Sequence, residues 1–192
     1  MTNKLINDWQ IEAGKEKDII LSSRIRLARN LKKYRFPNRS SSREKSEMIE
    51  HLRSKLDFLS GAGYDFYLMQ NLNKVERSVL HEEHLISRDH AENPAEKALF
   101  LNNDKNISIM INEEDHLRIQ ILRSGLEFKD IWSKINKLDN QLDQRLEYAF
   151  SEKWGYLTSC PTNVGTALRA SVMCHLPALV LSGRIDNILG AV

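Results

Sequence analysis

The chain has 192 residues, of which 41% are hydrophobic and 28% charged, and 28 Lys and Arg against 26 Asp and Glu give a formal net charge of +2. This composition is typical of one soluble globular domain and excludes collagen-like, low-complexity and wholly disordered chains. The longest strongly apolar run, 176–181, contains Pro177 and falls far short of the roughly 18 residues that a membrane span needs.

The first half of the chain alternates between strand and helix patterns. Residues 18–27 alternate in character with period two, which predicts a strand. Residues 40–59 begin with a serine-rich cap and continue with apolar side chains at helical spacing, which predicts an amphipathic helix. A short aromatic run at 64–69 predicts a second strand, and 74–85 a polar helix.

The second half opens with a hairpin signal, because turn-forming residues separate two strand-like runs at 98–101 and 107–111. Further strands are predicted at 117–122 and 155–159, further helices at 128–150 and from about 178 to the end, and a loop at 160–166. Strands adjacent in sequence, with helices between groups of them, favour an α+β fold with a mostly antiparallel sheet flanked by helices. A parallel doubly wound sheet is the alternative. No repeat or linker divides the chain, so we expect a single domain over 1–192.

Two arginines on the first predicted strand form the first candidate cluster. Arg24 and Arg26 lie two residues apart, so both point to the same face beside Ser22. A solvated strand face is the common role of such a pair, and an anion bound between the like charges is the other. The two common glycine-rich nucleotide signatures are absent from the sequence, so a phosphate site would have to be built another way.

A run of three carboxylates, Glu113, Glu114 and Asp115, directly follows a predicted strand. Such a run is often only a solvated turn. A carboxylate at a strand end is also what a guanidinium or amine substrate requires for bidentate anchoring and proton removal.

The two cysteines differ in their surroundings. Hydroxyl-bearing residues surround Cys160, with Arg169 close behind, so this thiol is either an inert buried group or an ionised, reactive one. Cys174 precedes His175 in an apolar run and is expected to be packed. Two cysteines give neither a disulfide framework nor a zinc motif, and no signal peptide is visible, so we expect a cytoplasmic location.

Together these segments resemble a known family. Segments 22–30, 112–118, 160–166 and 169–171 are similar, in order and spacing, to the ATP:guanidino phosphotransferases. The resemblance extends over nearly the whole chain and is closest to the bacterial protein-arginine kinase branch, because 84–87 and 169–179 also match it.

The resemblance implies ATP-dependent phosphorylation of arginine side chains in proteins. It implies that Glu114 holds the guanidinium and takes its proton, and that Cys160 is the reactive thiol beside the substrate. The nucleotide-binding residues that it implies are Ser22, Ser23, Arg24, Ile25, Arg26, His84, Arg118, Arg169, Ala170, Ser171, Val172 and Met173. Mg²⁺ is expected mainly on the phosphates, with no metal ligand from the protein.

Two departures from the family pattern concern the loop and the ends of the chain. Ala167 replaces a glycine common in the family, which costs about 1 kcal/mol if that backbone needs a positive φ. The family's catalytic domain continues past the position of Val192 with a further arginine and glutamate, so we expect a C-terminally truncated domain. We also expect no helical domain ahead of the first arginine motif, where kinases of free arginine or creatine carry one.

Two alternatives to the protein-arginine kinase stay open: a kinase of a free guanidino metabolite, and a catalytically incomplete nucleotide-binding or adaptor module. The expected partners are arginine-bearing protein substrates and, by family resemblance, stress-response regulators, a Clp-type protease system and a second copy of the chain. No membrane is expected, and no direct nucleic-acid binding, because no aromatic platform is interleaved with the arginines.

Overall fold

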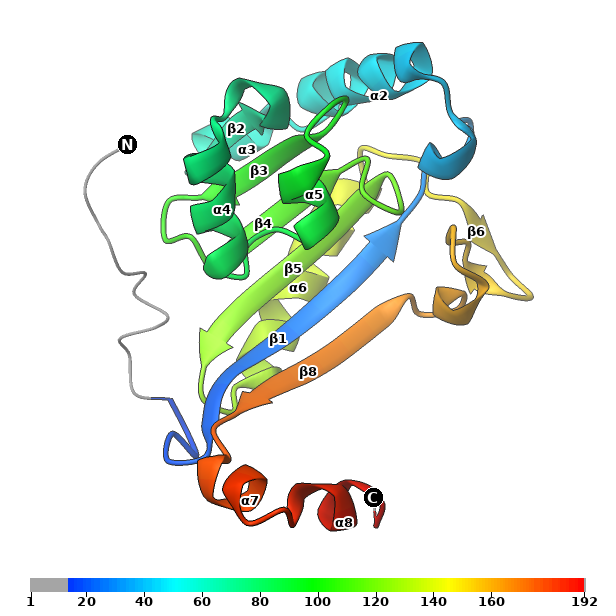
Figure 1. The fold of residues 1–192 in the computed structure, drawn as a ribbon. Helices are drawn as coiled ribbons and strands as arrows, with labels where there is room; N and C mark the ends of the chain where they lie inside the picture. The colour runs from blue at the N-terminus through cyan, green and yellow to red at the C-terminus, as the bar shows by residue number, and fades with distance from the viewer. Residues whose placement is uncertain (1–13, 192) are drawn as a thin grey trace.

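The computed structural model describes residues 14–191, which are built around a six-stranded sheet (Figure 1). The strand order is β2-β3-β4-β5-β1-β8, and every neighbouring pair is antiparallel. The strands are β1 (Ile20–Arg29), β2 (Tyr64–Leu68), β3 (Ala98–Asn102), β4 (Ile107–Ile111), β5 (Leu117–Ser124) and β8 (Leu168–Cys174). A two-stranded ribbon pairs β6 (Phe150–Ser151) with β7 (Gly155–Tyr156). The α+β antiparallel prediction is confirmed, and the parallel alternative is wrong.

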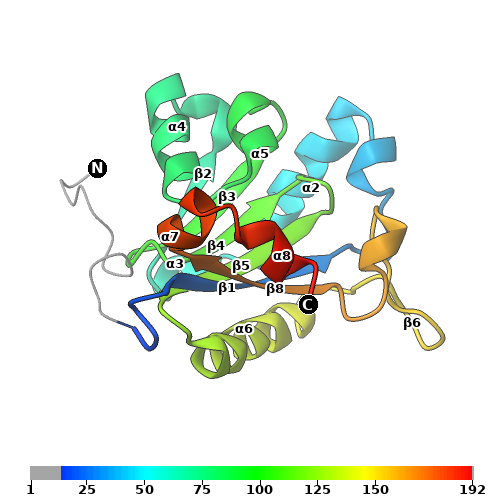
Figure 2. The same cartoon turned by 60° about the horizontal axis from the view of Figure 1, so that its bottom comes forward.

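Helices cover both faces of this sheet. They are α2 (Ser42–Lys55), α3 (Phe58–Gly61), α4 (Lys74–Glu82), α5 (Arg88–Glu92), α6 (Phe128–Asp143), α7 (Pro177–Leu181) and α8 (Ile185–Leu189), with short 3-10 turns at Pro37–Arg39, Met69–Asn71 and Pro161–Asn163. Helix α6 lies along one face, and α4 and α5 lie on the other (Figure 2). Among residues 14–191, no helix has both the length and the apolar character needed to cross a bilayer.

The alternation of β3 shows why this arrangement is stable. Ala98 and Phe100 point into a large apolar cluster shared with α2, α3 and α6. Leu99 and Leu101 point the other way, into a smaller cluster shared with α4. Both faces of this strand are therefore buried, whereas most residues of the edge strand β8 are exposed.

The first predicted helix starts and stops for local reasons. The Ser41 side chain accepts the Glu44 N–H, and the Glu44 carboxylate accepts the Ser41 N–H, so the serine-rich start forms a capping box. The predicted single helix over 40–59 is wrong after Lys55, because α2 ends there and α3 is a separate short turn.

The predicted helix over 128–150 is also too long. The chain leaves helical geometry after Asp143 because its next backbone groups pair with the end of β1. The Ala149 N–H donates to the Asn30 carbonyl at 2.7 Å, and the Lys32 N–H donates to the Glu147 carbonyl at 2.9 Å. This non-local pairing outweighs the helical spacing of the apolar side chains.

Near the C-terminus two predicted elements have different boundaries, and one strand has no predicted counterpart. The strand predicted over 155–159 is only Gly155–Tyr156, and the final predicted helix is divided into α7 and α8 around Gly183, whose φ is 67°. No element was predicted for 168–174, which forms β8.

Candidate functional site

The sheet brings arginines from distant segments to one face. Arg26 pairs with Arg169 across β1 and β8, and Ala28 pairs with Arg118 across β1 and β5. Directly paired residues of an antiparallel sheet share a face, and Arg24 lies two residues from Arg26. The four guanidinium groups therefore project from the face that carries α4 and α5 farther along the sheet.

Mutual repulsion marks this cluster. Burial, followed by the charges of Arg118, Arg24 and Arg169, lowers the pKa of Arg26 to about 10. Burial and the charges of Arg118 and Arg169 also lower the pKa of Arg24. Glu113 offsets only part of the positive charge felt by Arg26. The cluster is therefore short of negative charge, and a polyanion would relieve the repulsion.

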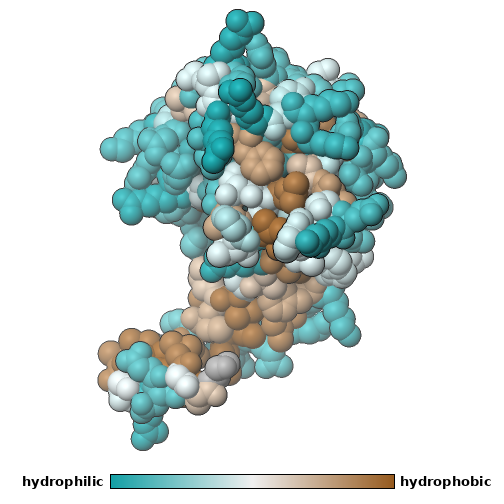
Figure 3. All heavy atoms as spheres, turned by 90° about the vertical axis from the view of Figure 1, so that its right-hand side faces the viewer, coloured by the Kyte–Doolittle hydropathy of each residue, from teal (hydrophilic) through white to brown (hydrophobic). Residues whose placement is uncertain are grey.

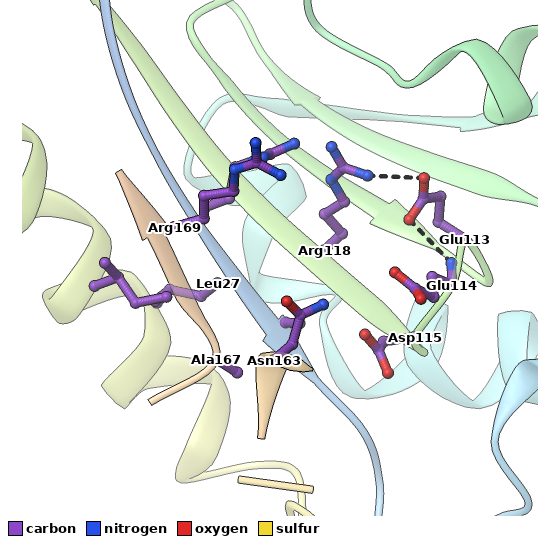
Figure 4. Close-up of a pocket in the computed structure, with 11 residues that line it drawn as sticks. Leu27, Glu113, Glu114, Asp115, Arg118, Asn163, Ala167 and Arg169 are labelled. Carbon is purple, nitrogen blue, oxygen red and sulfur yellow. Dashed lines mark hydrogen bonds and ion pairs between the residues drawn. The ribbon is translucent and has the colours of Figure 1, made fainter. Parts of the chain in front are cut away.

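Glu113 is an ion-pair partner that the sequence reasoning missed. Its Oε1 lies 2.8 Å from Arg118 NH1, and its Oε2 accepts the Glu114 N–H at 2.9 Å (Figure 4). Burial would raise the pKa of Glu113, but Arg118 and the Glu114 N–H hold that pKa below its usual range. The available signal was an acidic residue five positions before an arginine, on either side of a tight turn.

Glu114 carries the opposite imbalance. Burial and the neighbouring charges of Asp115 and Glu113 raise the pKa of its carboxyl, and Arg118 compensates in part. A cation placed against this side chain would stabilise its ionised form.

One cavity, of about 120 Å³, is lined both by arginines whose positive charge is not neutralised and by Glu114 (Figure 4). The charged residues that line it are Arg26, Glu113, Glu114, Asp115, Arg118 and Arg169. One cavity therefore offers positive groups to an anion and, beside them, carboxylates to a cation.

Asp115 fixes the carboxylate turn in place. Its Oδ1 accepts the Asn30 side-chain amide at 2.6 Å and the Ser159 N–H at 2.7 Å. Asn30 Oδ1 in turn accepts the His116 N–H at 2.9 Å. The turn is thus tied both to the end of β1 and to the loop that precedes Cys160.

A buried ion pair also holds the loop that follows Cys160. Arg29, only 3% exposed, donates to Asp139 at 2.7 Å through NH2, and its NH1 donates to the Thr166 carbonyl at 3.2 Å. The Tyr156 ring lies 3.6 Å from the Arg29 guanidinium carbon, and the Tyr148 hydroxyl donates to Asp139 at 3.2 Å. One arginine therefore connects β1, α6 and the loop after Cys160.

The structure contradicts the sequence-based expectation for one of the two cysteines. Cys160 is half-buried, and its Sγ lies 2.9 Å from Thr162 Oγ1, at the start of the turn whose Asn163 lines the cavity. Cys174 is exposed, so the prediction of a packed thiol is wrong. This cysteine ends the edge strand β8, in which the neighbouring Val172 and Met173 side chains are also exposed.

The remaining candidate residues fall on two faces. His84 lies near Arg24, since burial and the charges of Arg24 and His81 lower its pKa. Ser171 Oγ accepts Arg24 Nε at 3.4 Å, and Met173 pairs with the buried Ser22. Four side chains alternate to the α6 face, away from the arginines: Ser23, Ile25, Ala170 and Val172.

Ala167 has a positive φ, the backbone conformation for which the family's glycine at this position is suited. Its φ is 50°, in the left-handed region, and its carbonyl accepts the Ala28 N–H at 3.0 Å. The strained residue thus lies directly before β8, where the loop is hydrogen-bonded to β1 and lines the cavity. In the part of the chain described, no three His, Cys, Asp or Glu side chains are grouped as a metal site.

Comparisons with known proteins agree on the kind of domain. Residues 47–192 match the family model described as ATP:guanido phosphotransferase, C-terminal catalytic domain. A protein-arginine kinase of Halothermothrix orenii is 49% identical over 195 residues, covering 100% of this chain and 55% of that protein. One of Geobacillus thermodenitrificans is 46% identical, covering 99% and 53%. The chain thus spans about half the length of these relatives.

Solved structures give the same answer at lower identity. The duplicated taurocyamine kinase from Schistosoma mansoni, with bound transition state analog components, has a TM-score of 0.78 and 26% identity, covering 88% of this chain and 25% of that one. Lombricine kinase has a TM-score of 0.78 and 25% identity, covering 97% and 56%.

Proposed function

Given that this chain belongs to the ATP:guanido phosphotransferase family, we propose that its site binds MgATP and transfers the γ-phosphoryl group to an arginine side chain of a protein. The observation that carries the proposal is the single cavity in which unneutralised arginines lie beside Glu114. The names of the similar bacterial proteins support a protein-borne arginine as the acceptor.

The arginines would serve the nucleotide. Phosphoryl transfer spreads charge over the oxygens of the moving group, and positioned cations stabilise that charge. Arg24, Arg26 and Arg169 supply such cations without a carboxylate partner among residues 14–191. Arg118 uses NH1 for Glu113, which fixes its direction and leaves its other N–H groups for phosphate oxygens. His84 would lie at the rim of the same group.

Glu114 would serve the acceptor. A guanidinium is protonated at neutral pH and is a poor nucleophile, so the carboxylate must both orient it and remove a proton. The nitrogen then forms a bond to the γ-phosphorus as the bond from that phosphorus to the β,γ-bridging oxygen breaks. The proton passes to a Glu114 oxygen, and ADP leaves with the bridging oxygen. Mg²⁺ carried on the phosphates supplies further charge neutralisation.

The other candidates take supporting roles in this proposal. Cys160 would offer a polarisable sulfur beside the guanidinium. Ser22, Ser171 and Met173 would contact the nucleotide from the arginine face. The residues whose side chains face α6 would act only through their backbone groups: Ser23, Ile25, Ala170 and Val172.

Thermal denaturation with and without MgATP tests the proposal on this chain. At about a hundred times its Kd, the nucleotide should stabilise the fold by about 3 kcal/mol. For a chain of this size that raises the thermal midpoint by roughly 5–10 °C. Arg24→Ala and Arg169→Ala should each remove most of the rise.

Arg43→Ala is the matched control. Arg43 is an exposed arginine of α2 whose Nε lies 2.8 Å from Glu47, and it is not among the residues that line the cavity. This variant should keep the full response to MgATP. Equal responses in all three variants, or none in the wild-type chain, would contradict the proposal.

A further inference from the structure

A second cavity, of about 730 Å³, adjoins the one described above. It is lined by Arg35, Phe36, Asn38, Arg39 and Ser159. Four of these residues come from the segment that follows β1, and the fifth lies directly before Cys160. The catalytic proposal gives none of them a role.

The two cavities share a wall. Asp115 lines the first cavity and Ser159 lines the second, and the Ser159 N–H donates to Asp115 Oδ1 at 2.7 Å. The second cavity therefore lies on the Glu114 and Cys160 side of the site. A chain bearing an arginine in the first cavity would pass its neighbouring residues over the second.

The polar groups of the second cavity lack partners. Arg35 and Arg39 are exposed, and within residues 14–191 neither forms an ion pair. The charge of Arg35 reaches Glu44 only as a minor addition to the Ser41 hydrogen bonds that lower the pKa of that carboxyl. The hydroxyl of Ser159 is buried and has no hydrogen-bond partner. A buried hydroxyl without a partner is uncommon, so this one points to a polar group that completes it.

Hydrogen bonds fix the backbone of the segment that carries Arg35 and Arg39. The Arg35 carbonyl accepts the Ser40 hydroxyl at 2.8 Å and the His116 ring N–H at 3.0 Å. The Arg39 N–H donates to the Phe36 carbonyl at 2.9 Å, closing a 3-10 turn with Pro37 at its start. A fixed backbone lowers the entropy lost when the two guanidinium groups bind an anion.

From this geometry we infer that the second cavity binds a carboxylate side chain of the substrate protein, close in sequence to the arginine that is phosphorylated. The inference rests on the proposed function and adds an acidic sequence preference to it. Planar guanidinium forks match carboxylates in a bidentate manner, and the Asn38 amide and Ser159 hydroxyl supply neutral donors.

Peptide binding to this chain tests the inference. Two fluorescein-labelled peptides carry one central arginine and differ only in their flanking residues, which are Asp and Glu in one and Asn and Gln in the other. Fluorescence anisotropy should show about tenfold tighter binding of the acidic peptide. Raising the salt concentration should shrink that preference.

Substitutions of the two cavity arginines test whether these residues cause the preference for the acidic peptide. Arg35→Ala and Arg39→Ala should each reduce it about threefold, and the double variant should abolish it. Both residues are exposed, so thermal midpoints without ligand should stay at the wild-type value. Arg43→Ala, which removes an exposed arginine outside the cavity, should leave the preference unchanged.

The outcomes separate this inference from the proposed function. If the wild-type chain binds both peptides equally, or neither, while MgATP still stabilises it, the acidic preference is wrong and the nucleotide site stands. If MgATP gives no stabilisation but the acidic preference responds to Arg35 and Arg39, the proposed function fails and the cavity still binds carboxylates. A preference that survives in the double variant would overturn the assignment to these two arginines.

Discussion

Acid is expected to loosen the carboxylate turn through His116, whose ring must stay neutral where it lies. His116 is 2% exposed. Its Nδ1 accepts the Leu31 N–H at 3.1 Å, and its Nε2 donates to the Arg35 carbonyl at 3.0 Å. A second proton on the ring would set an N–H on Nδ1 against the Leu31 N–H. Burial therefore lowers the pKa of His116 to about 4, although the Arg35 carbonyl and the charge of Asp115 act to raise it.

The pKa of His116 differs between the folded and the unfolded chain, and this difference sets the direction and the size of the change in stability with pH. A histidine whose pKa is lowered on folding binds its proton more readily in the unfolded chain, so its stabilising contribution is present above the unfolded pKa of about 6.5 and is lost as the pH falls toward about 4. For this one group, moving from about pH 7 to about pH 5 costs about 2 kcal/mol of unfolding free energy. Burial also lowers the pKa of His90 to about 4, which adds a similar loss.

Urea unfolding at several pH values measures this loss. His116→Gln should be less stable at neutral pH, since it breaks the two ring hydrogen bonds, but its stability should fall by about 2 kcal/mol less than that of the wild type between those pH values. The control is Val75→Ala, which shortens an exposed side chain, changes no titratable group and should keep the wild-type pH dependence. If the His116 variant lost as much stability with acid as the wild type, the assignment of a neutral buried ring would be refuted.

Three further changes have defined expectations. Asp139→Ala leaves the Arg29 guanidinium buried without its ion-pair partner, so urea unfolding should show a loss of about 3–5 kcal/mol, and a loss below about 1 kcal/mol would contradict the buried network. Ala167→Gly should raise stability by up to about 1 kcal/mol because it relieves the left-handed backbone, whereas Ala170→Gly in the regular strand β8 should lower it. In a phosphoryl-transfer assay, Glu114→Gln should keep MgATP binding but slow phosphoryl transfer by at least about 100-fold, and normal turnover would exclude Glu114 as the base.

Local patterns account for the parts of the fold that the sequence could predict. The alternation in β1 and the capping residues of α2 depend on side chains within one element, and both are present. The end of α6 depends on backbone pairing with Asn30, more than a hundred residues away, so no local pattern marks it. The edge strand β8 does alternate in sequence, with Leu168, Ala170 and Val172 against Arg169 and Ser171, so here the local signal was present and was overlooked.

The functional site also combines features that a local sequence pattern predicts with features that only the fold creates. That Arg24 and Arg26 share a face follows from strand spacing alone. Their proximity to Arg118 and Arg169 requires the registers of β1 with β5 and with β8, which no local pattern supplies, and it was expected only from the family resemblance. The second cavity was missed because Arg35 and Arg39 read as ordinary loop residues. Its signal is three-dimensional, because Ser159 from one loop and the two arginines from another line the same cavity only in the folded chain.

The position of β8 at the edge of the sheet gives the site an uneven resistance to local opening. Within residues 14–191 this strand pairs only with β1, its Val172 and Met173 side chains are exposed, and an apolar area is visible on this side of the molecule (Figure 3). Strands at an edge open at lower free energy than central strands, so β8 amides should exchange with solvent deuterium sooner than those of β5. Arg169 lies on the strand that opens and Arg118 on the one that does not. A polyanion held by both would therefore slow amide exchange across 168–174 far more than in the centre of the sheet.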